Sequence, residues 1–238
     1  MHVLIVHAHP EPDSFNVAMT RAAVEALGDD GHDVVVSDLY AQQFAPTAGR
    51  DDFLSRADPT RFHLQGEQAH AASSNGFSRQ LREQKAHLAR ADLLILQFPL
   101  WWGAPPAILK GWFDRVLAYG FAYVDARRFD TGLLRGRRAL ISVTTGGTRA
   151  RFCDGGVYGE IDKVLWPVRH LTLEYMGYDV EEPFVSYGIP RIDAPAREEC
   201  LRSWRQRVVE VARKPVAPQP LLPAAALEAV GDQAWKKS

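Results

Sequence analysis

Residues 3–19 read VLIVHAHPEPDSFNVAM, an apolar run followed by a polar loop and a stretch with helical spacing. The run Val3–Val6 is bounded by proline and aspartate, which is typical of a buried strand. Ser14 stands directly before Phe15 and the apolar residues that follow, so we predict that Ser14 caps a helix that ends near Gly28. A strand that leads straight into a helix is typical of an α/β fold.

The same alternation continues along the chain. We predict further strands at residues 33–36, 92–96, 138–143 and 178–187, and helices at residues 79–90, 107–117, 161–176 and 196–211. Residues 38–75 carry no long periodic signal and are expected to form an extended connection that can include short helices. This pattern favours a flavodoxin-like, doubly wound, five-stranded parallel sheet with strand order 2-1-3-4-5 and helices on both faces. In such a sheet a ligand binds beyond the carboxyl ends of the strands, at the switch point between strands 1 and 3.

The composition is that of an ordinary globular protein. The 238 residues are 46% hydrophobic and 24% charged, with a formal net charge of −1, which excludes a disordered chain and gives no reason to expect nucleic acid as a partner. The most apolar window, residues 93–109, is too short and too interrupted for a membrane-spanning helix. Cys153 and Cys200 form neither a disulfide framework nor a CxxC pair, so we expect a soluble, cytoplasmic protein. We predict one domain at residues 1–213 and a Pro- and Ala-rich tail at residues 214–238.

The loop after the first strand delivers Ser14 and Asn16 to a helix N-terminus. Free N–H groups and the helix dipole favour a phosphate there, although most N-cap residues bind no ligand and the pattern alone favours Ser14 as a helix cap and nothing more. The loop contains neither a GxGxxG nor a GxxxxGK[ST] motif, which argues against Rossmann and P-loop sites. His7 and His9 share one face of the strand, but no third ligand accompanies them, so no metal is expected.

Two more unusual segments follow strands 3 and 4 at the same edge of the sheet. Trp101 and Trp102 are adjacent in a proline-rich loop, and buried indoles there require a partner. That partner is either a flat aromatic ligand or, alternatively, the core or a second subunit. Gly146 and Gly147 end strand 4, and form either a plain turn or a backbone whose N–H groups point at negative charge on a ligand. Three tyrosines are candidate pocket walls: Tyr123, Tyr158 and Tyr175.

Together these residues resemble the two-electron NAD(P)H:quinone oxidoreductases of flavodoxin-like fold, the DT-diaphorase family. The resemblance covers about residues 1–212. It is carried by His9 with Ser14-Phe15-Asn16, Ser37-Asp38-Leu39-Tyr40, Gln97-Phe98-Pro99-Leu100, residues 106–113, Phe121-Ala122-Tyr123, Thr144-Thr145-Gly146-Gly147, Leu165-Trp166-Pro167, Glu182-Pro183 and Arg197.

The resemblance implies a tightly bound FAD, NAD(P)H as co-substrate and a homodimer with two sites at the subunit interface. It also implies a ping-pong mechanism in which hydride passes from NAD(P)H through the flavin to a quinone. Tyr123 and Tyr175 would wall the substrate cavity from the partner subunit. The implied contacts are His9, Ser14, Phe15 and Asn16 for the diphosphate region of FAD; Pro99, Leu100, Trp101, Trp102, Thr144, Thr145, Gly146 and Gly147 for its ring; and Ile189, Arg197 and Leu201 for its adenosine end.

The sequence departs from the family pattern around the expected substrate site. The usual Gln-Trp-Phe is Trp101-Trp102-Gly103 here, which removes a bulky wall and makes Gly103 part of the substrate pocket. The second tyrosine of a Tyr-x-Tyr pair is Asp125. We therefore expect a substrate pocket that differs from that of the family.

A second departure concerns the pair that stabilises the reduced flavin in the family, a tyrosine and a histidine. They correspond to Phe152 and Tyr158 in this chain, and Phe152 has no hydroxyl to donate. The candidates for stabilising the negative charge are therefore the Tyr158 hydroxyl and the N–H groups of Gly146 and Gly147.

Other functions that use the same fold remain open. An azo- or nitro-group reductase would pass the same hydride to another acceptor, and a regulatory subunit of a potassium-efflux system would use the flavin site for control. An electron-carrier flavodoxin fits less well, because the first loop lacks a Ser/Thr-rich phosphate motif and the net charge is only −1.

Overall fold

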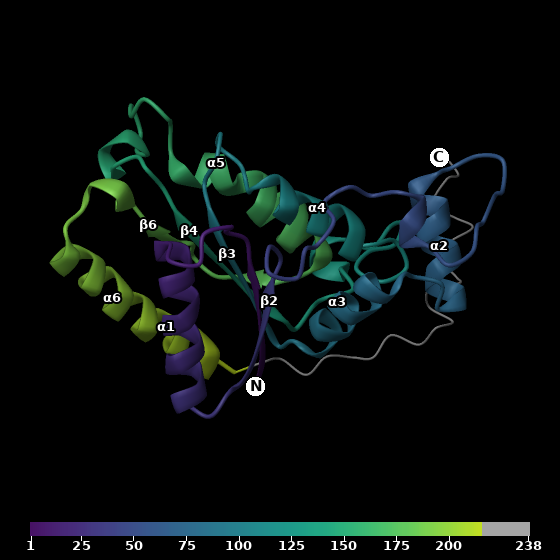
Figure 1. Ribbon diagram of the computed structural model, residues 1–238, viewed down its shortest axis with the longest axis horizontal. Helices are drawn as coiled ribbons and strands as arrows, with labels where there is room; N and C mark the ends of the chain where they lie inside the picture. Colours follow the sequence, from purple (N-terminus) through teal and green to yellow (C-terminus); the bar gives the residue numbers. More distant parts are fainter. Residues whose placement is uncertain (216–238) are drawn as a thin grey trace.

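A parallel sheet forms the centre of the computed structural model, which describes residues 1–215 (Figure 1). Its strands are β1 (His2–His7), β2 (Asp33–Asp38), β3 (Leu93–Pro99), β4 (Arg138–Thr144), β5 (Asp179–Val180) and β6 (Phe184–Ser186). Their order is β2-β1-β3-β4-β5, which confirms the predicted order, and β6 also pairs with β4. Residues 216–238, which make up nearly all of the predicted tail, lie outside the described residues.

The predicted fifth strand, residues 178–187, is interrupted. β5 pairs with the start of β4 and β6 with its end, and Glu181, Glu182 and Pro183 separate the two pieces. Pro183 has no N–H to donate to a strand ladder, which restricts proline to the ends and edges of sheets. The prediction of one continuous strand was wrong in this detail, although both pieces lie at the predicted edge.

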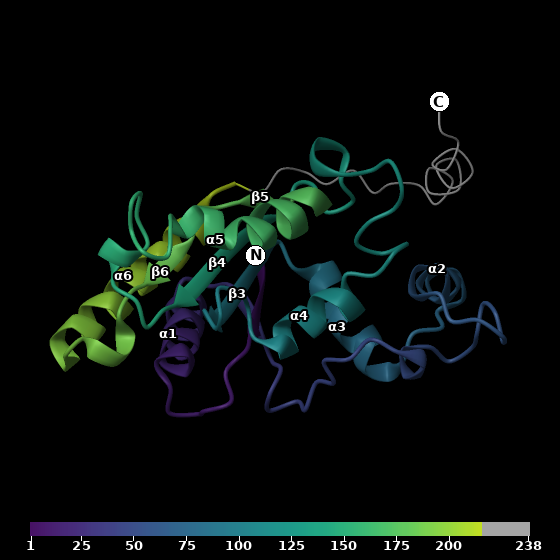
Figure 2. The ribbon, with the colours of Figure 1, turned by 90° about the horizontal axis from the view of Figure 1, so that it is seen from above.

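Helices cover both faces of the sheet (Figures 1 and 2). One face carries α1 (Phe15–Asp29) and α6 (Ala194–Arg213), and the other carries α3 (Arg79–Arg90), α4 (Ala107–Val116) and α5 (Ile161–Val168). Within residues 38–75, the expected extended connection contains α2 (Leu64–Ser74), which lies at the end of the molecule far from α6. Short 3₁₀ turns occur at Arg50–Asp52, Phe129–Thr131, Arg149–Arg151 and Ile189–Arg191.

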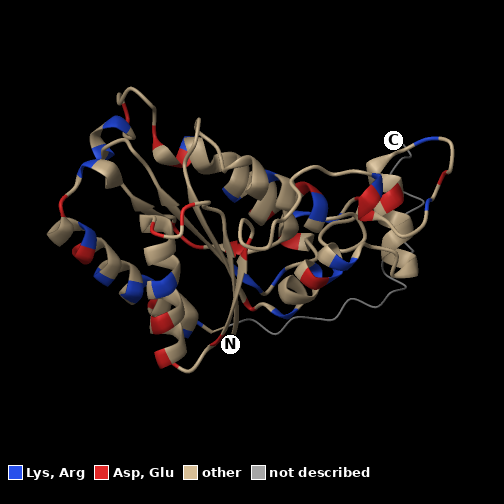
Figure 3. Ribbon diagram, in the orientation of Figure 1, with Lys and Arg blue, Asp and Glu red and all other residues tan. Residues whose placement is uncertain are grey.

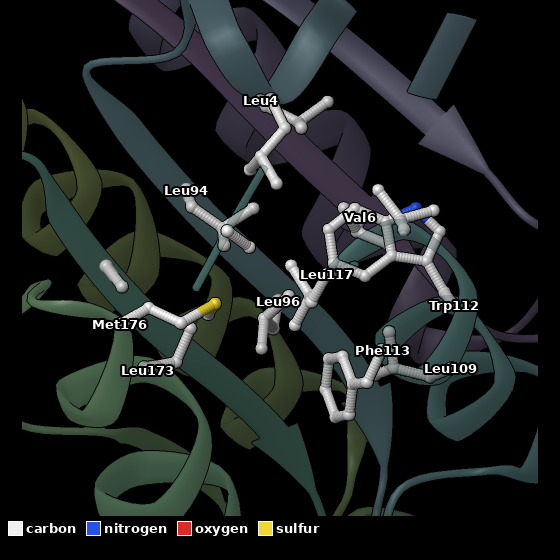
Figure 4. Close-up of a cluster of buried hydrophobic side chains, with 14 of the residues drawn as sticks. Leu4, Val6, Leu94, Leu96, Leu109, Trp112, Phe113, Leu117, Leu173 and Met176 are labelled. Atoms are coloured by element: carbon white, nitrogen blue, oxygen red, sulfur yellow. The ribbon is translucent and has the colours of Figure 1, made fainter. Parts of the chain in front are cut away.

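A buried hydrophobic cluster lies on each face of the sheet. Leu4 and Val6 of β1 enter the cluster that α4 covers with Trp112 (Figure 4). Val3 and Ile5 of the same strand enter the cluster under α1 and α6. Successive β1 side chains therefore face opposite cores, which explains why this strand is a continuous apolar run in the sequence.

The segment predicted as a helix at residues 161–176 changes type part-way. After α5 it continues as a π-helical turn, Arg169–Leu173, and a 3₁₀ turn, Glu174–Met176. Pro167 lies inside α5 and has no N–H for the helical ladder, so the regular hydrogen-bond pattern is broken near this point. Gly177 ends the segment with a φ of +98°, a conformation that favours glycine.

Charged side chains add surface contacts between the two helices of the α1 face. Arg205 of α6 pairs with Glu25 of α1 at 3.1 Å, and Arg213 pairs with Asp30 just beyond α1. Figure 3 shows basic residues along α6 and acidic residues at the end of α1. None of the helices within residues 1–215 has the length and hydropathy to span a membrane.

Candidate functional site

The first turn of α1 lies at the edge of the sheet where the carboxyl ends of the strands meet, and backbone N–H groups of this turn are available to a ligand. Ser14 Oγ accepts a hydrogen bond of 3.3 Å from the N–H of Val17, so Ser14 caps the helix as predicted. The N–H groups of Phe15 and Asn16 have no acceptor among residues 1–215. Because the Ser14 hydroxyl already serves the helix, an anion at this point would be bound by backbone N–H groups and the helix dipole.

The side chain of Asn16 is buried and joins this helix to two strands. Its Nδ2 donates to Thr144 Oγ1 at 2.9 Å, and its Oδ1 accepts from Gln97 Nε2 at 2.9 Å. Gln97 lies at the end of the fully buried strand β3 and was not among the predicted site residues. The signal in the sequence was a single amide side chain in an otherwise apolar strand, which requires a polar partner when buried.

The loop after β3 forms a tight hairpin that presents tryptophan to solvent. Trp101 and Ala104 exchange two backbone hydrogen bonds of 3.0 Å, and the central residues have positive φ, +52° at Trp102 and +72° at Gly103. Positive φ at both central residues is typical of a type I′ turn. Glycine adopts this conformation easily at position 103, whereas a bulky residue such as Trp102 is under backbone strain there. Trp102 is fully exposed, so it does not pack on the core, and a Cβ at position 103 would meet open space.

Trp101 lies beside the first loop. It is half-exposed, and its indole ring is centred 6.0 Å from the ring of His9. The N–H of Leu100 donates to the carbonyl of Thr144 at 2.8 Å, and Pro99 is the register partner of Thr144 in the sheet. The three predicted loops are thus brought to one edge of the sheet.

The loop after β4 is fixed through its carbonyl groups. Gly147 C=O accepts from the Thr145 hydroxyl at 2.7 Å and from the N–H of Gly188 at 2.9 Å, and Gly146 C=O accepts from the Arg191 guanidinium. Within residues 1–215 no group accepts a hydrogen bond from the N–H of Gly146 or Gly147. The loop therefore offers two N–H donors at the same edge of the sheet as the exposed indoles, an arrangement that can stabilise negative charge.

Phe152 and Tyr158 pack directly on this loop. Their rings are 5.0 Å apart, and a Cβ at Gly147 would lie 2.7 Å from Phe152 and 3.1 Å from Tyr158, so the packing requires glycine. Tyr158 is half-exposed, and its hydroxyl accepts a hydrogen bond of 3.4 Å from the Arg151 guanidinium. Arg151 was not predicted, since nothing in the sequence indicates that this loop folds back on itself.

The residues expected at the adenosine end lie on α6 and on the short turn that precedes it. The guanidinium of Arg197 in α6 donates to the carbonyl of Ile189 at 3.1 Å. Leu201 follows Arg197 by one helical turn and packs, with Phe15, against the cluster under α1 and α6.

The predicted substrate residues Tyr123 and Tyr175 line one cavity of about 540 Å³, which also reaches Ala104 of the tryptophan hairpin. The two tyrosine rings are 6.3 Å apart. Burial raises the pKa of Tyr123 above its usual value, so its hydroxyl stays neutral near pH 7. Asp125, the residue that departs from the family pattern, accepts a hydrogen bond of 3.2 Å from the Tyr119 hydroxyl.

The two histidines of the first strand have separate partners. His7 is buried with its Nδ1 2.8 Å from Thr20 Oγ1, and His9 Nδ1 accepts from the N–H of Glu11 at 3.1 Å. The part of the chain that the structure describes contains no group of three His, Cys, Asp or Glu side chains that could hold a metal ion.

Comparison with known proteins identifies the family of this chain. A family model described as a flavodoxin-like fold matches residues 1–208. The chain is 42% identical over 209 residues to NAD(P)H dehydrogenase [quinone] 1 of Cavia porcellus, and the match covers 87% of this chain and 76% of that protein. The chain belongs to the NAD(P)H:quinone oxidoreductase family.

Other members of the NAD(P)H:quinone oxidoreductase family match over similar lengths. The chain is 41% identical to ribosyldihydronicotinamide dehydrogenase [quinone] of Mus musculus over 210 residues, covering 88% of this chain and 91% of that protein. A crystal structure from Klebsiella pneumoniae assigned as a quinone reductase superposes with a TM-score of 0.85 at 33% identity, covering 98% of this chain and 96% of the other.

Proposed function

We propose that this protein is an FAD-dependent enzyme that transfers hydride from NAD(P)H to quinones by a ping-pong mechanism. The observation that carries the proposal is the pair of free N–H groups at Gly146 and Gly147, which lie at the same sheet edge as the exposed indoles and the open α1 terminus. The family relationship supports NAD(P)H-dependent quinone reduction as the activity. FAD, the mechanism and the oligomeric state are part of the proposal.

Two groups of residues in the proposed site would suit a flavin dinucleotide. The N–H groups of Phe15 and Asn16 would bind the diphosphate, with His9 and Ser14 close by. Ile189, Arg197 and Leu201 would contact the adenosine, a group that FMN lacks, and this favours FAD over FMN. When bound, the flavin supplies a two-electron acceptor and donor of hydride.

The ring of the cofactor would lie along two groups of residues. Trp101, Trp102, Pro99 and Leu100 would line one side, and Thr144, Thr145, Gly146 and Gly147 the other. The Gly146 and Gly147 N–H groups would hydrogen-bond the pyrimidine edge, where negative charge develops.

The N–H groups that would stabilise negative charge on the flavin are fixed in position by the hydrogen bonds of their loop. The N–H groups of Gly146 and Gly147 share peptide planes with the carbonyl groups of Thr145 and Gly146. Because the Thr145 carbonyl accepts from the N–H of Ile189 at 3.1 Å and the Gly146 carbonyl accepts from the Arg191 guanidinium, both N–H groups are held in place before any charge forms. The Tyr158 hydroxyl is the third donor in our proposal. Donors that are fixed in advance need no reorganisation during the reaction, which lowers the barrier to hydride transfer.

The substrate would enter the cavity between Tyr123, Tyr175 and Ala104. Its walls are mainly apolar and aromatic, which suits a flat quinone as well as a nicotinamide ring. Gly103 is not among the residues that line this cavity, whereas its neighbour Ala104 is, so a role for Gly103 at the entrance is part of the proposal. Since one cavity serves both substrates, the oxidised nicotinamide must leave before the quinone enters, and this order gives ping-pong kinetics.

A homodimer would complete the site. Trp102, Trp166 and Leu171 are large apolar side chains with about half or more of their surface exposed, and Leu171 lines the substrate cavity. Exposed apolar side chains at a cavity mouth are typical of an interface between subunits. We place the enzyme in the cytoplasm, in keeping with its two unpaired cysteines.

Steady-state kinetics with the purified protein test the proposal. The expected result is a yellow dimer that releases FAD on denaturation and gives parallel double-reciprocal lines when a quinone and the hydride donor are varied. NADH, NADPH and ribosyldihydronicotinamide should be compared, because the relatives are named for different donors. Converging lines, FMN as the only flavin bound, or a monomer that reduces quinones at full rate would each contradict one part of the proposal.

A further inference from the structure

A second cavity lies between α2, α3 and the segment that contains Phe121, and it shares no residue with the cavity of Tyr123 and Tyr175. Its volume is about 340 Å³, within the usual range for small-molecule sites. α2 and α3 lie toward the end of the molecule away from α6 (Figures 1 and 2). Most of the side chains that line it are small or aromatic: Ala71, Ala72, Ala86, Ala89, Phe77 and Phe121. Its polar lining consists of Asn75, Arg82 and Lys85.

Lys85 of α3 lines this cavity and forms no ion pair with any carboxylate of residues 1–215. The side chain is 8% exposed, and its Nζ finds no hydrogen-bond acceptor among residues 1–215. Nζ lies 2.9 Å from the centre of the Phe77 ring and 5.1 Å from that of Phe121. The buried carboxylate of Asp52 is already engaged by Arg115 at 2.6 Å.

Burial lowers the pKa of Lys85 to about 7. The negative charge of Asp52 raises the pKa, but by less than burial lowers it. Near neutral pH a large fraction of this side chain is therefore the free amine, whereas an exposed lysine is almost wholly charged. The face of the Phe77 ring favours the charged ammonium form of Lys85. It therefore partly opposes the lowering of the pKa, but it supplies no hydrogen bond. A desolvated lysine in an apolar cavity is the arrangement that makes an amine nucleophilic at neutral pH.

The rim of the cavity carries a positive charge. Arg82 lies one turn before Lys85 on α3, is exposed, and has no carboxylate within ion-pair distance in the described part of the chain. A ligand that combines a flat apolar body with an acidic group would match the walls and the rim together.

We propose that Lys85 is a covalent binding site for a small aromatic aldehyde that carries a carboxylate or phosphate. The Lys85 nitrogen attacks the aldehyde carbon and forms the carbon–nitrogen bond, the carbonyl oxygen leaves as water, and a neutral imine results with no change in oxidation state. Nζ has no exposed surface at rest, so the half-buried ring of Phe121 must rotate to admit the aldehyde. Arg82 holds the acidic group at the rim.

Reductive trapping followed by peptide mapping tests this site. The full-length protein with its flavin is incubated with 4-carboxybenzaldehyde and cyanoborohydride between pH 6 and pH 10, and each lysine is quantified by mass spectrometry. Lys163 is the internal control, because it is 74% exposed and paired with Glu160. At pH 7 we expect Lys85 to be labelled at least tenfold faster than Lys163, and this advantage should shrink above pH 9 as the control lysine loses its proton.

Variants separate the cavity from the lysine itself. Ala86→Leu fills the cavity from the exposed side of α3 and should reduce Lys85 labelling to the level of Lys163, while Ala86→Ser should leave it unchanged. Arg82→Gln should remove the preference for 4-carboxybenzaldehyde over benzaldehyde. Equal labelling of all lysines, or an Ala86→Leu protein labelled as fast as the parent, would overturn the proposal whether or not quinone reduction is observed.

Discussion

Asn16 Nδ2 donates a hydrogen bond of 2.9 Å to Thr144 Oγ1, so the first turn of α1 is held directly against the end of β4. The same amide accepts a hydrogen bond from Gln97 at the end of β3. The region proposed to bind the diphosphate and the region proposed to bind the ring are therefore connected through one buried side chain, and neither can shift alone.

Replacing Asn16 with alanine should loosen both regions. The change leaves Gln97 and Thr144 buried without their partner, which costs roughly 1–3 kcal/mol of unfolding free energy. We expect faster loss of the flavin on dilution, measured by absorbance after gel filtration, together with a lower denaturation midpoint in urea. Asn16→Asp keeps an acceptor for both neighbours but places a buried negative charge beside the proposed diphosphate site, so it should lose flavin at least as fast. Full flavin retention in Asn16→Ala would show that the network does not position the cofactor.

The two glycines after β4 should respond differently to alanine. A Cβ at Gly147 would lie 2.7 Å from Phe152, whereas a Cβ at Gly146 would meet only Arg191, at an ordinary distance of 3.7 Å. Gly147→Ala should therefore lower stability by about 1–3 kcal/mol through overpacking and should slow quinone reduction at least tenfold. Gly146→Ala should keep most of both properties. Equal effects of the two substitutions on thermal unfolding and turnover would contradict the packing described above.

Tyr158→Phe keeps the ring that packs on Gly147 and removes the hydroxyl. Loss of one well-placed donor slows an enzyme by about 10²–10³ at the extreme. Because Tyr158 is half-exposed, we expect about tenfold slower flavin reduction in stopped-flow measurements, with unchanged flavin content. Arg151→Met should have an effect in the same direction, since it removes the guanidinium that bonds the hydroxyl. An unaltered rate would mean that the N–H groups of the loop suffice.

Trp102→Gly should raise stability and lower activity. A non-glycine residue at positive φ costs on the order of 1–3 kcal/mol, and glycine recovers part of this strain against its own entropy cost of about 0.5–1 kcal/mol. We expect a higher melting temperature for the flavin-free protein and weaker flavin binding by titration. Gly103→Ala, the neighbouring change at φ +72°, should instead destabilise the turn. A lower melting temperature for Trp102→Gly would show that the indole stabilises the fold.

His7 should make the protein sensitive to mild acid. Burial lowers its pKa in the folded state, so the unfolded chain binds a proton near pH 6.5 that the folded chain does not. The contribution of neutral His7 to the unfolding free energy is therefore fully present above about pH 6.5. It is lost as the pH falls toward the pKa of His7 in the folded protein, with a slope of at most about 1.4 kcal/mol per pH unit. His7→Leu should flatten this part of the curve in urea unfolding between pH 5 and pH 7, and an unchanged slope would argue against it. Thr20→Val, which removes only the hydrogen-bond partner, serves as the control.

The sequence predicts the sheet well because each strand is a short apolar run, and the right-handed crossover rule then leaves few possible orders. It also locates the three loops of the candidate site, because residues at the carboxyl ends of parallel strands must meet at one edge. The break near Pro183 was missed because one proline in an apolar stretch is compatible with an edge strand.

Contacts between distant residues could not be predicted in the same way. α2 has few large apolar residues, so it carries little helical periodicity, and the buried pair of Asp52 with Arg115 joins residues 63 positions apart. The contact of Arg151 with Tyr158 depends on how one loop folds back, and the role of Gln97 depends on a helix that packs above its strand. Such contacts are set by tertiary packing, which local patterns do not record.

The break at Glu181–Pro183 leaves no long outer strand beside β4 in the part of the chain that the structure describes. A long, flat outer strand presents a row of unpaired backbone groups to which another chain can add, which is a common route to aggregation. Here that position is taken by pieces of two and three residues, separated by a proline and by the exposed carboxylate of Glu182. This side of the sheet therefore offers few unpaired backbone groups to a second chain, and edge-to-edge association there is disfavoured.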